Sequence, residues 1–333
     1  MFAKLTDIAV SAIVSSIPSN KNFNYNKVSG DNKRTLDLIG VKNSYAVDKE
    51  TTTLDLCLDA AKLLIKKMKV KTIDIDILIV VTQTPDYLMP SCSNIVHKNL
   101  NLSQNCLCFD INQGCSGYVY GLHNIISIMK INKLKKGLLL VGDTISKTIR
   151  KDDMSHRMLF GDAGTATLLE YNKGEKIFFQ LGSDGNGHNK LMLKESAFKN
   201  NTKYRPEFYM DGKEVFLFAI SSVPKLIKNL IKSSKKKFPD IHYFVFHQAN
   251  KFMLSKIFDF LNIEEKKRLF SIEKYGNTSS ASIPLTLCKF NSKLNSKNKN
   301  IIIAGFGAGF SYAAAIVNLS NTKIFKIKNY EKK

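Results

Sequence analysis

Three residues, each placed where an apolar segment gives way to a turn, could together carry out acyl-thioester chemistry. The first is Cys115, in the run Asp110–Gly117, which follows a strand-like segment and opens an apolar helix pattern. Unpaired N–H groups at a helix N-terminus favour a thiolate, and neighbouring glycines let a substrate approach the sulfur. A lone cysteine in such a place is more often a small buried hydrophobe, so other residues must decide between these interpretations.

Two later turns supply a histidine and an asparagine. His247 ends the apolar strand-like run Tyr243–Phe246, and Asn277 lies in the turn Tyr275–Pro284 before another apolar helix pattern. Taken singly, His247 could be a core or capping histidine and Asn277 a turn residue. Together with Cys115 they form a Cys-His-Asn set of the kind that supports covalent acyl transfer.

The elements that position these residues occur twice along the chain. Strand-like runs at Ile77–Val81 and Leu138–Gly142 enclose the Cys115 turn and its helix. At similar spacing, runs at Tyr243–Phe246 and Ile301–Gly305 enclose the Asn277 turn and its helix. Two copies of one unit, in which short strands alternate with helices, predict an α/β fold with helix-covered sheets.

The composition is that of a globular protein without a membrane span. The chain has 333 residues, of which 44% are hydrophobic, and its apolar runs fall short of the roughly 20 residues that a membrane helix needs. The segment Met1–Pro18 contains Asp7 and alternates as a strand does, so no signal peptide is predicted. We therefore expect a cytoplasmic protein with no membrane association.

The charge and the cysteines exclude other classes of site. A net charge of +22 is compatible with a nucleic-acid-binding protein, but the lysines are scattered and not interleaved with aromatic residues as a stacking platform requires. We therefore predict no nucleic-acid binding; the positive field suits an acidic protein partner. The six cysteines form no CxxC pair and have no paired histidines, so neither a metal site nor a disulfide framework is predicted.

On these motifs the chain resembles the β-ketoacyl-acyl carrier protein synthase III family of the thiolase superfamily, from about residue 3 to about residue 319. The segments that carry the resemblance are Gly114–Gly117, Phe160–Gly164, His247–Asn250, Gly276–Ser279 and Gly305–Gly309. The resemblance implies a thiolase-like α/β fold with αβαβα layers, made of two duplicated halves. Residues 1–172 would carry the nucleophile, residues 173–320 the histidine and asparagine, and residues 321–333 a basic tail. Asp162 is expected to be structural, accepting hydrogen bonds from backbone N–H groups.

The resemblance also implies a two-step mechanism without a metal or another cofactor. Cys115 attacks an acyl thioester while the backbone N–H groups of Cys115 and Ala308 form the oxyanion hole. A malonyl thioester then loses CO2, and His247 and Asn277 donate hydrogen bonds to the resulting enolate. Because an asparagine amide cannot take a proton from carbon, this pair favours decarboxylative Claisen condensation.

Two other classes of function compete with a 3-oxoacyl-acyl carrier protein synthase. A related acyltransferase would acylate Cys115 and pass the acyl group to an alcohol or amine, with His247 as base and no decarboxylation. The presence of Asn277 disfavours it, whereas the absence of the family's coenzyme A clamp, described below, favours it. A non-catalytic basic binding protein is disfavoured because such a scaffold has no reason to keep all three residues.

The partners implied by the resemblance are acyl carrier protein, acyl and malonyl thioesters, and a second copy of the chain. Met89 aligns with a position that the family inserts into the acyl pocket of the partner subunit, which implies a homodimer. From the sequence alone, Met89 could equally pack inside its own subunit. Lys251 and Lys256 are candidate contacts to the carrier protein.

The chain departs from the family pattern at two surfaces. At the coenzyme A clamp, the tryptophan that stacks on adenine aligns with Arg34, and two arginines align with Leu38 and Met154. Basic residues of the carrier-binding surface align with Phe252, Leu217, Asp259 and Phe260. Loss of these stacking and phosphate-binding groups makes acetyl-coenzyme A a poor primer. We therefore expect a carrier-bound or unusual acyl donor and a role more specialised than the initiation of fatty-acid biosynthesis.

Overall fold

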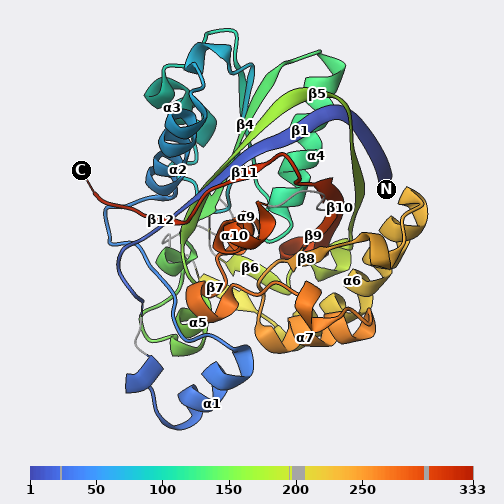
Figure 1. Cartoon of the computed structure of the whole chain (residues 1–333). Helices are drawn as coiled ribbons and strands as arrows, with labels where there is room; N and C mark the ends of the chain where they lie inside the picture. The colour runs from blue at the N-terminus through green and yellow to red at the C-terminus, as the bar shows by residue number, and fades with distance from the viewer. Residues whose placement is uncertain (23–24, 195, 197–206, 296–299, 333) are drawn as a thin grey trace.

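The computed structural model describes residues 1–22, 25–194, 196, 207–295 and 300–332. Its strands are β1 (Phe2–Ile17), β2 (Ile77–Val81), β3 (Leu107–Ile111), β4 (Lys136–Asp143), β5 (Ala163–Ser183), β6 (Leu191–Lys194), β7 (Glu207–Met210), β8 (Tyr243–Phe246), β9 (Asn300–Gly307), β10 (Ser311–Asn318), β11 (Lys323–Ile324) and β12 (Lys328–Asn329). Its helices are α1 (Gly30–Ile39), α2 (Thr53–Met68), α3 (Cys92–Leu100), α4 (Gly117–Ile131), α5 (Met154–Leu159), α6 (Gly212–Ser234), α7 (Lys251–Phe260), α8 (Ile272–Tyr275), α9 (Ser282–Lys289) and α10 (Asn291–Leu294). Figure 1 shows the strands in the middle and the longer helices around them.

The strand pairing repeats between the two halves of the chain. In the first half the order is β3-β2-β4-β5, with β2 parallel to β3 and β4, and β5 antiparallel to β4. In the second half the order is β8-β9-β10-β5, with β8 parallel to β9, and β10 antiparallel to both β9 and β5. The mixed, helix-covered sheets predicted from the repeated pattern are confirmed.

The long strand β5 belongs to both halves. Its first part, residues 163–170, pairs with β4, its last part, residues 178–183, pairs with β10, and β1 pairs with β5 along both parts. The predicted division between residues 172 and 173 therefore falls inside a continuous strand, and the two halves remain a prediction. The predicted basic tail pairs with β1 through β11 and β12, and Lys328 Nζ lies 2.5 Å from Asp59 Oδ1.

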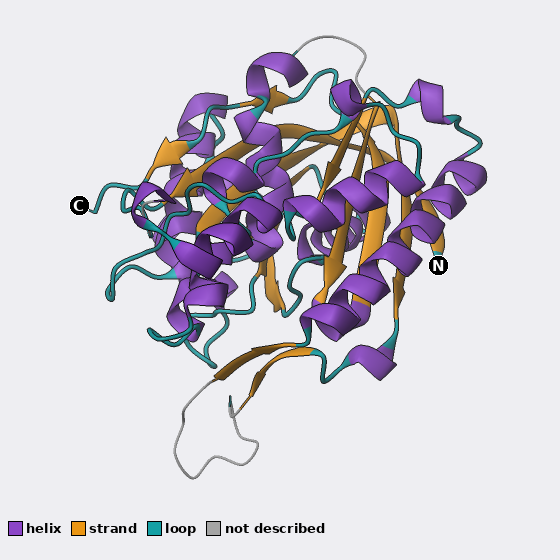
Figure 2. Cartoon of the chain, turned by 90° about the horizontal axis from the view of Figure 1, so that it is seen from below, coloured by secondary structure: helices purple, strands orange, loops and turns teal. Residues whose placement is uncertain are grey.

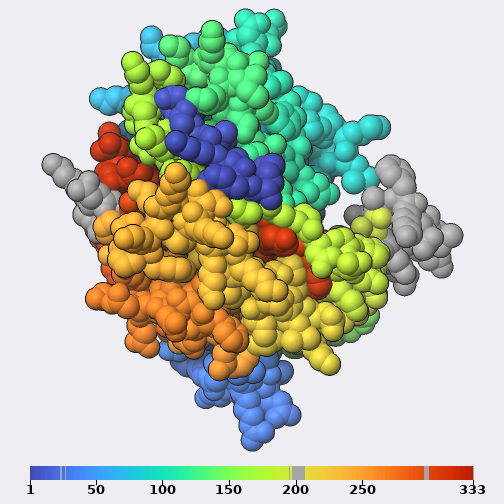
Figure 3. Space-filling view, turned by 90° about the vertical axis from the view of Figure 1, so that its right-hand side faces the viewer, coloured from blue at the N-terminus to red at the C-terminus, as the bar shows by residue number. Residues whose placement is uncertain are grey.

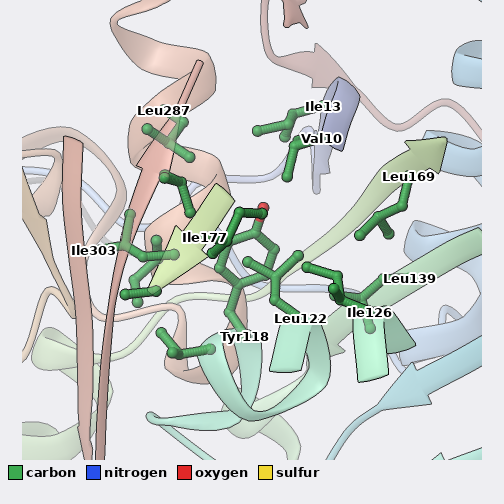
Figure 4. Close-up of a cluster of buried hydrophobic side chains, with 14 of the residues drawn as sticks. Val10, Ile13, Tyr118, Leu122, Ile126, Leu139, Leu169, Ile177, Leu287 and Ile303 are labelled. Atoms are coloured by element: carbon green, nitrogen blue, oxygen red, sulfur yellow. The ribbon is translucent and has the colours of Figure 1, made fainter. Parts of the chain in front are cut away.

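A central helix layer separates the two parts of the sheet. Because side chains alternate along a strand, Ile77, Ile79 and Val81 of β2 pack on this layer, while Leu78 and Val80 point to the opposite face. Helices α4 and α9 supply the layer, and strands of both halves contact it. Figure 4 draws 14 residues of this buried cluster, in which Tyr118, Leu122 and Ile126 of α4 lie between Ile303 of β9 and Leu139 of β4. The N-terminus of α4 and the turn before α9, which carry the predicted site, are thereby held close together.

Two outer helix layers complete the αβαβα order. Helices α2 and α3 cover the first half of the sheet, and α6 and α7 cover the second. In Figure 3 the yellow and orange atoms of α6 and α7 form much of the lower surface. The hairpin β6–β7 lies apart from this sheet, at the lower edge of the molecule in Figure 2. Within the described part of the chain, no helix is long and apolar enough to span a bilayer.

Candidate active site

The three predicted residues line one cavity of about 860 Å³. Cys115 lies between β3 and α4, His247 directly follows β8, and Asn277 follows α8. Ala308 lines the same cavity, at the end of β9. Residues that are 193 positions apart in sequence therefore meet in one cavity, next to the ends of β3, β8 and β9.

The Cys115 thiol is almost buried, with 8% of the residue exposed. Burial raises the pKa of Cys115 to about 12, the negative charge of Asp143 acts in the same direction, and hydrogen bonds from backbone N–H groups oppose them. The expectation that the helix N-terminus favours the thiolate is therefore wrong for the free protein, since desolvation outweighs the helix N–H groups. The resting nucleophile is a thiol.

The oxyanion-hole prediction names two backbone N–H groups, and both lie near the Cys115 sulfur. The N–H groups of Ala308 and of Cys115 itself act on the thiol. Gly307 makes this approach possible, because a methyl group at that position would lie 2.8 Å from Cys115 Sγ. Ser311 connects the turn of Cys115 to the loop of Ala308. Its hydroxyl lies 2.7 Å from Ser116 Oγ and donates to the carbonyl of Ala308 at 2.9 Å.

His247 is held as a neutral imidazole. It is 1% exposed, and its Nδ1 lies 2.7 Å from Ser282 Oγ. Burial lowers the pKa of His247 to about 3, so the ring carries no charge at neutral pH. A neutral imidazole whose Nδ1 is held by Ser282 has its other ring nitrogen available to a substrate.

The adjacent Gln248 fixes the loop that carries His247. Its Nε2 donates to the carbonyl of Phe246 at 2.7 Å, and its Oε1 accepts from the backbone N–H groups of Ser271 and Ile272 at 2.7 and 3.1 Å. Because Ile272 begins α8, which leads to Asn277, this buried amide connects the histidine loop to the asparagine loop.

Asn277 is 5% exposed, and both the oxygen and the nitrogen of its side-chain amide contact the backbone. Its Oδ1 accepts from the backbone N–H of Ser279 at 2.9 Å, and its Nδ2 lies 3.5 Å from the carbonyl of Ala249. Its backbone bonds Leu159 and Gly161 on the other side. The long Nδ2 contact leaves the amide N–H₂ with capacity for a stronger acceptor, such as a thioester oxygen.

Ser279 contacts all three predicted residues, although nothing in the sequence singled it out. Its side chain bonds the Cys115 thiol, its backbone bonds His247, and its N–H donates to Asn277. It is 3% exposed and has φ +48°, a conformation rare for residues other than glycine. Strained buried residues of this kind concentrate at functional sites. The only available signal was its place in the Gly276–Ser279 segment.

Two buried carboxylates support the site from behind. Asp143, at the end of β4, accepts from Gln83 N at 2.7 Å and from Ser280 Oγ at 2.5 Å, which joins the two halves beneath Cys115. Asp162 accepts from the backbone N–H groups of Val47 and Ser146 at 2.9 and 3.0 Å. Asp162 thus has the backbone partners that its predicted structural role calls for.

The remaining predicted residues lie outside this cluster. Met89 is 84% exposed, on a loop whose Tyr87 and Leu88 line the cavity, so packing of Met89 inside its own subunit is excluded. Lys251 and Lys256 are exposed on α7, and Lys256 Nζ lies 5.6 Å from the centre of the Phe252 ring. The apolar residues that replace the expected clamp and surface cations are all exposed: Leu38, Met154, Leu217, Phe252 and Phe260.

Gly276→Ala is expected to destabilise the fold next to Asn277. Gly276 has φ +65° and ψ −165°, and a methyl group there would lie 2.8 Å from the carbonyl oxygen of Leu159. Backbone strain of this kind costs about 1–3 kcal/mol, so the urea midpoint should fall. Gly185→Ala, where a methyl group meets nothing within 4 Å and φ is ordinary, is the control. Equal midpoints for the two variants would contradict the expectation.

Alkylation of Cys115 in the free protein should rise steeply with pH. Only the thiolate reacts, and with a pKa of about 12 the thiolate fraction grows about tenfold per pH unit. The rate of modification by iodoacetamide, followed by mass spectrometry of the Cys115 peptide, should therefore increase about 100-fold from pH 7 to pH 9. A rate that levels off below pH 8 would show instead a thiolate stabilised by the helix.

Comparisons with known proteins decide the family. The model of the "3-Oxoacyl-[acyl-carrier-protein (ACP)] synthase III" family matches residues 109–185, and that of its C-terminal part matches residues 231–319. A β-ketoacyl-[acyl-carrier-protein] synthase III of Clostridium tetani is 35% identical over 286 residues, which cover 81% of this chain and 85% of the relative. The chain belongs to this family. The synthase III family consists of condensing enzymes, so the chain is an acyltransferase enzyme.

Solved structures of the synthase III family have the same fold. A 3-oxoacyl-(acyl-carrier protein) synthase from Burkholderia xenovorans LB400 superimposes with a TM-score of 0.94 at 32% identity, covering 99% of each chain. A synthase III from Pseudomonas aeruginosa PAO1 gives 0.84 at 26% identity, covering 94% of this chain and 98% of that one. The predicted thiolase-like αβαβα fold is confirmed. The two matched segments of the family model include Cys115 in the first and His247, Asn277 and Ala308 in the second.

Proposed function

We propose that this enzyme acylates Cys115 and then condenses the acyl group with a malonyl thioester, with loss of CO2. The observation that carries the proposal is a thiol beside backbone N–H groups, in one cavity with two neutral hydrogen-bond donors, His247 and Asn277. The fixed N–H groups of Cys115 and Ala308 would stabilise the oxyanion, each by about 3 kcal/mol. The proposal places these four residues in the catalytic machinery.

In the first step the sulfur of Cys115 forms a bond to the acyl carbonyl carbon. The bond from that carbon to the donor's sulfur breaks, and the proton lost by Cys115 ends on the departing thiol. Because the Cys115 pKa is high in the free protein, proton removal accompanies attack rather than preceding it. In this proposal the proton passes through His247, which is neutral and lines the same cavity.

In the second step the malonyl thioester loses its terminal carboxylate as CO2. The electron pair of the broken C–C bond becomes an enolate, whose oxygen accepts hydrogen bonds from His247 and Asn277. The enolate carbon then attacks the acyl carbon on Cys115, the bond from that carbon to the Cys115 sulfur breaks, and the released thiolate takes up a proton from water to restore the resting thiol. The amide of Asn277 donates but cannot act as a base, which suits a step that needs no proton removal from carbon.

Acyl carrier protein is the proposed bearer of both thioesters. At the positions where the family clamps coenzyme A, this chain has Leu38 and Met154, which are 59% and 42% exposed, and Arg34, which bonds Asp31 of its own helix. The stacking tryptophan of the clamp is therefore replaced by an arginine, and Leu38 and Met154 have no group that could bind a phosphate. Lys251 and Lys256 on α7 are the proposed contacts to the carrier, and the cytoplasm is the proposed location.

The exposed apolar loop that carries Met89 supports the proposal that the enzyme is a homodimer. Tyr87, Leu88 and Met89 are 62%, 65% and 84% exposed and form a continuous apolar tip beside the cavity. Apolar tips of this kind mark sites of association. Insertion of Met89 into the partner's acyl pocket would bury the tip and close the pocket. The mass of the enzyme in solution, for the wild type and for Met89→Asp, tests the assembly.

The function is tested by the release of labelled CO2 from malonyl-carrier protein, measured with a panel of acyl donors. Donor-dependent release with formation of a 3-oxoacyl product is the expected result. If Cys115 becomes acylated, no CO2 is released and the acyl group passes to an alcohol or amine, the decarboxylative proposal fails.

Replacing Lys251 and Lys256 together by alanine should weaken use of the carrier. We expect KM for malonyl-carrier protein to rise about fivefold to tenfold at low salt, because rim charges act mainly on encounter, and the difference should shrink at high salt. The exposed pair Lys66 and Lys67 on α2, replaced in the same way, is the control. An unchanged KM at low salt would remove α7 from the carrier surface.

A further inference from the structure

The lining of the cavity is divided by chemistry. Residues of the second half are mostly apolar: Leu191, Leu193, Phe208, Met210, Val215, Met253 and Phe306. Residues of the first half are mostly polar: Thr52, Thr53, Gln83, Thr84, Asp86, Asn112, Gln113, Thr144, Lys147 and Thr148. A cavity that bound only a plain hydrocarbon chain would gain nothing from this polar wall, since its groups would lose water without replacement.

Most side chains of the polar wall bond one another. Thr53 Oγ1 lies 2.9 Å from both Thr84 Oγ1 and Thr144 Oγ1, and Thr84 Oγ1 also accepts from Thr144 N at 2.9 Å. Asp86 accepts from Thr52 Oγ1 at 2.8 Å. These hydroxyl and carboxylate groups are therefore parts of the scaffold and are not the ones available to a substrate.

Three amides of the wall differ, because each keeps a side-chain group without a hydrogen-bond partner among the described residues: Gln83, Asn112 and Gln113. Of these, Gln83 and Asn112 bond each other. Gln83 Nε2 donates to Asn112 Oδ1 at 3.2 Å. Within the described residues, neither Gln83 Oε1 nor Asn112 Nδ2 has a hydrogen-bond partner. One amide carbonyl oxygen, an acceptor, and one amide N–H₂ group, a donor, thus remain side by side. If both side-chain amides were turned over, so that O and N exchange places, one acceptor and one donor would still remain.

The unused oxygen lies next to the reaction centre. A methyl group on Gly114 would come within 2.3 Å of Gln83 Oε1, and the same point is 3.7 Å from Ala308 Cβ. Gly114 directly precedes Cys115, and Ala308 supplies the proposed oxyanion-hole N–H. Glycine at position 114 therefore makes room for the Gln83 amide beside the carbon that is attacked.

We propose that Gln83 and Asn112 select an acyl primer that bears a hydroxyl group near its thioester carbonyl, of the 3-hydroxyacyl class. This inference rests on the proposed function. A hydroxyl both donates and accepts, so it matches the unused oxygen of Gln83 and the unused N–H₂ of Asn112 together; a keto oxygen would satisfy only one. Gln83 follows β2 and lines the cavity of Cys115 together with Tyr87 and Leu88, whose loop is proposed to close the acyl pocket. The pair therefore faces the acyl group.

In the free protein Asn112 is exposed, so the groups of the pair are open to water. An acyl chain bound over the pair displaces that water, and only a hydroxylated chain replaces its hydrogen bonds. We expect kcat/KM for 3-hydroxybutyryl-carrier protein to exceed that for butyryl-carrier protein by at least about tenfold. In Gln83→Leu, which keeps the volume but removes the acceptor, this ratio should fall to about one. The condensation product from the preferred primer would be a 5-hydroxy-3-oxoacyl thioester.

The experiment presents both donors, on the same carrier protein, in competition without malonyl thioester. Mass spectrometry of the Cys115 peptide then measures which acyl group is attached, in wild type, in Gln83→Leu and in Gln104→Leu, an exposed glutamine outside the cavity. A preference for the hydroxylated group in wild type and Gln104→Leu, lost in Gln83→Leu, supports the inference.

Two results would overturn the inference, and they are distinguishable. If butyryl and 3-hydroxybutyryl groups are attached equally, or if the preference survives in Gln83→Leu, the acyl selectivity is wrong while the condensing function stands. If no donor acylates Cys115, the proposed function itself fails, and the selectivity with it.

Discussion

Alanine in place of Cys115 is expected to abolish both acylation and condensation while leaving the decarboxylation of malonyl-carrier protein measurable. Without the Cys115 sulfur, the proposed site has no nucleophile that could carry the acyl group. The rate of formation of the 3-oxoacyl product should therefore fall by at least about 10³-fold. Decarboxylation needs an enolate stabilised by His247 and Asn277, and the contacts that hold these two side chains do not involve the sulfur: Ser282 holds one and the Ser279 backbone the other.

The measurement that separates the two activities is CO2 release against product formation in the same reaction. In the wild type the two should be equal when an acyl donor is present. In Cys115→Ala, CO2 should appear without product and without dependence on the donor. Cys288→Ala removes another buried thiol, in α9 and away from the cavity, and is the control for stability. Full condensation by Cys115→Ala would show that another group carries the acyl intermediate.

The parts of this site that the sequence predicts are those that depend on local pattern. The strand-like runs Ile77–Val81 and Tyr243–Phe246 are β2 and β8 with the same bounds. Both strands are fully or almost fully buried. Buried strands are continuous apolar runs in the sequence, which makes these two easy to predict as strands. Because catalytic turns follow strands in α/β folds, the pattern predicts the place of His247, directly after β8, and that of Cys115, in the turn between β3 and α4.

Other features depend on contacts between distant segments, and local pattern cannot predict them. The pKa of Cys115 is decided by how deeply the turn is buried against Gly307 and by the charge of Asp143, not by the helix that begins at Gly117. Ser279 acquires its place through a backbone conformation that the sequence does not require. The long strand β5 bridges both halves, which hides any boundary between them.

The unused amide groups of Gln83 and Asn112 show the same limit. Their residue types suggest nothing unusual in a turn after a strand. Only the distances show that the threonines around them are paired with one another and that Gly114 gives Gln83 access to the reaction centre. The polar wall and the apolar wall come from different halves of the chain, so the specificity of the cavity is a property of the folded arrangement.

Asn277→Asp should reduce decarboxylative condensation by about 10²- to 10³-fold, the usual effect of losing one fixed donor to a developing oxyanion. The substitution keeps the shape of the side chain, and a carboxylate oxygen can still accept from Ser279 N, as Asn277 Oδ1 does at 2.9 Å. The other oxygen would replace the N–H₂ group that faces the substrate. A negative charge would then lie beside the enolate oxygen in a buried site, where repulsion is poorly screened.

The position of this loss in the reaction distinguishes a catalytic Asn277 from a merely structural one. Acylation of Cys115 precedes enolate formation, so acyl-enzyme should accumulate in Asn277→Asp when donor and malonyl-carrier protein are both supplied, and CO2 release should fall in parallel with product. Asn105→Asp, in an exposed turn, adds the same charge away from the cavity and is the control. If CO2 release stays at the wild-type rate, the enolate does not depend on this amide, and His247 alone would have to stabilise it.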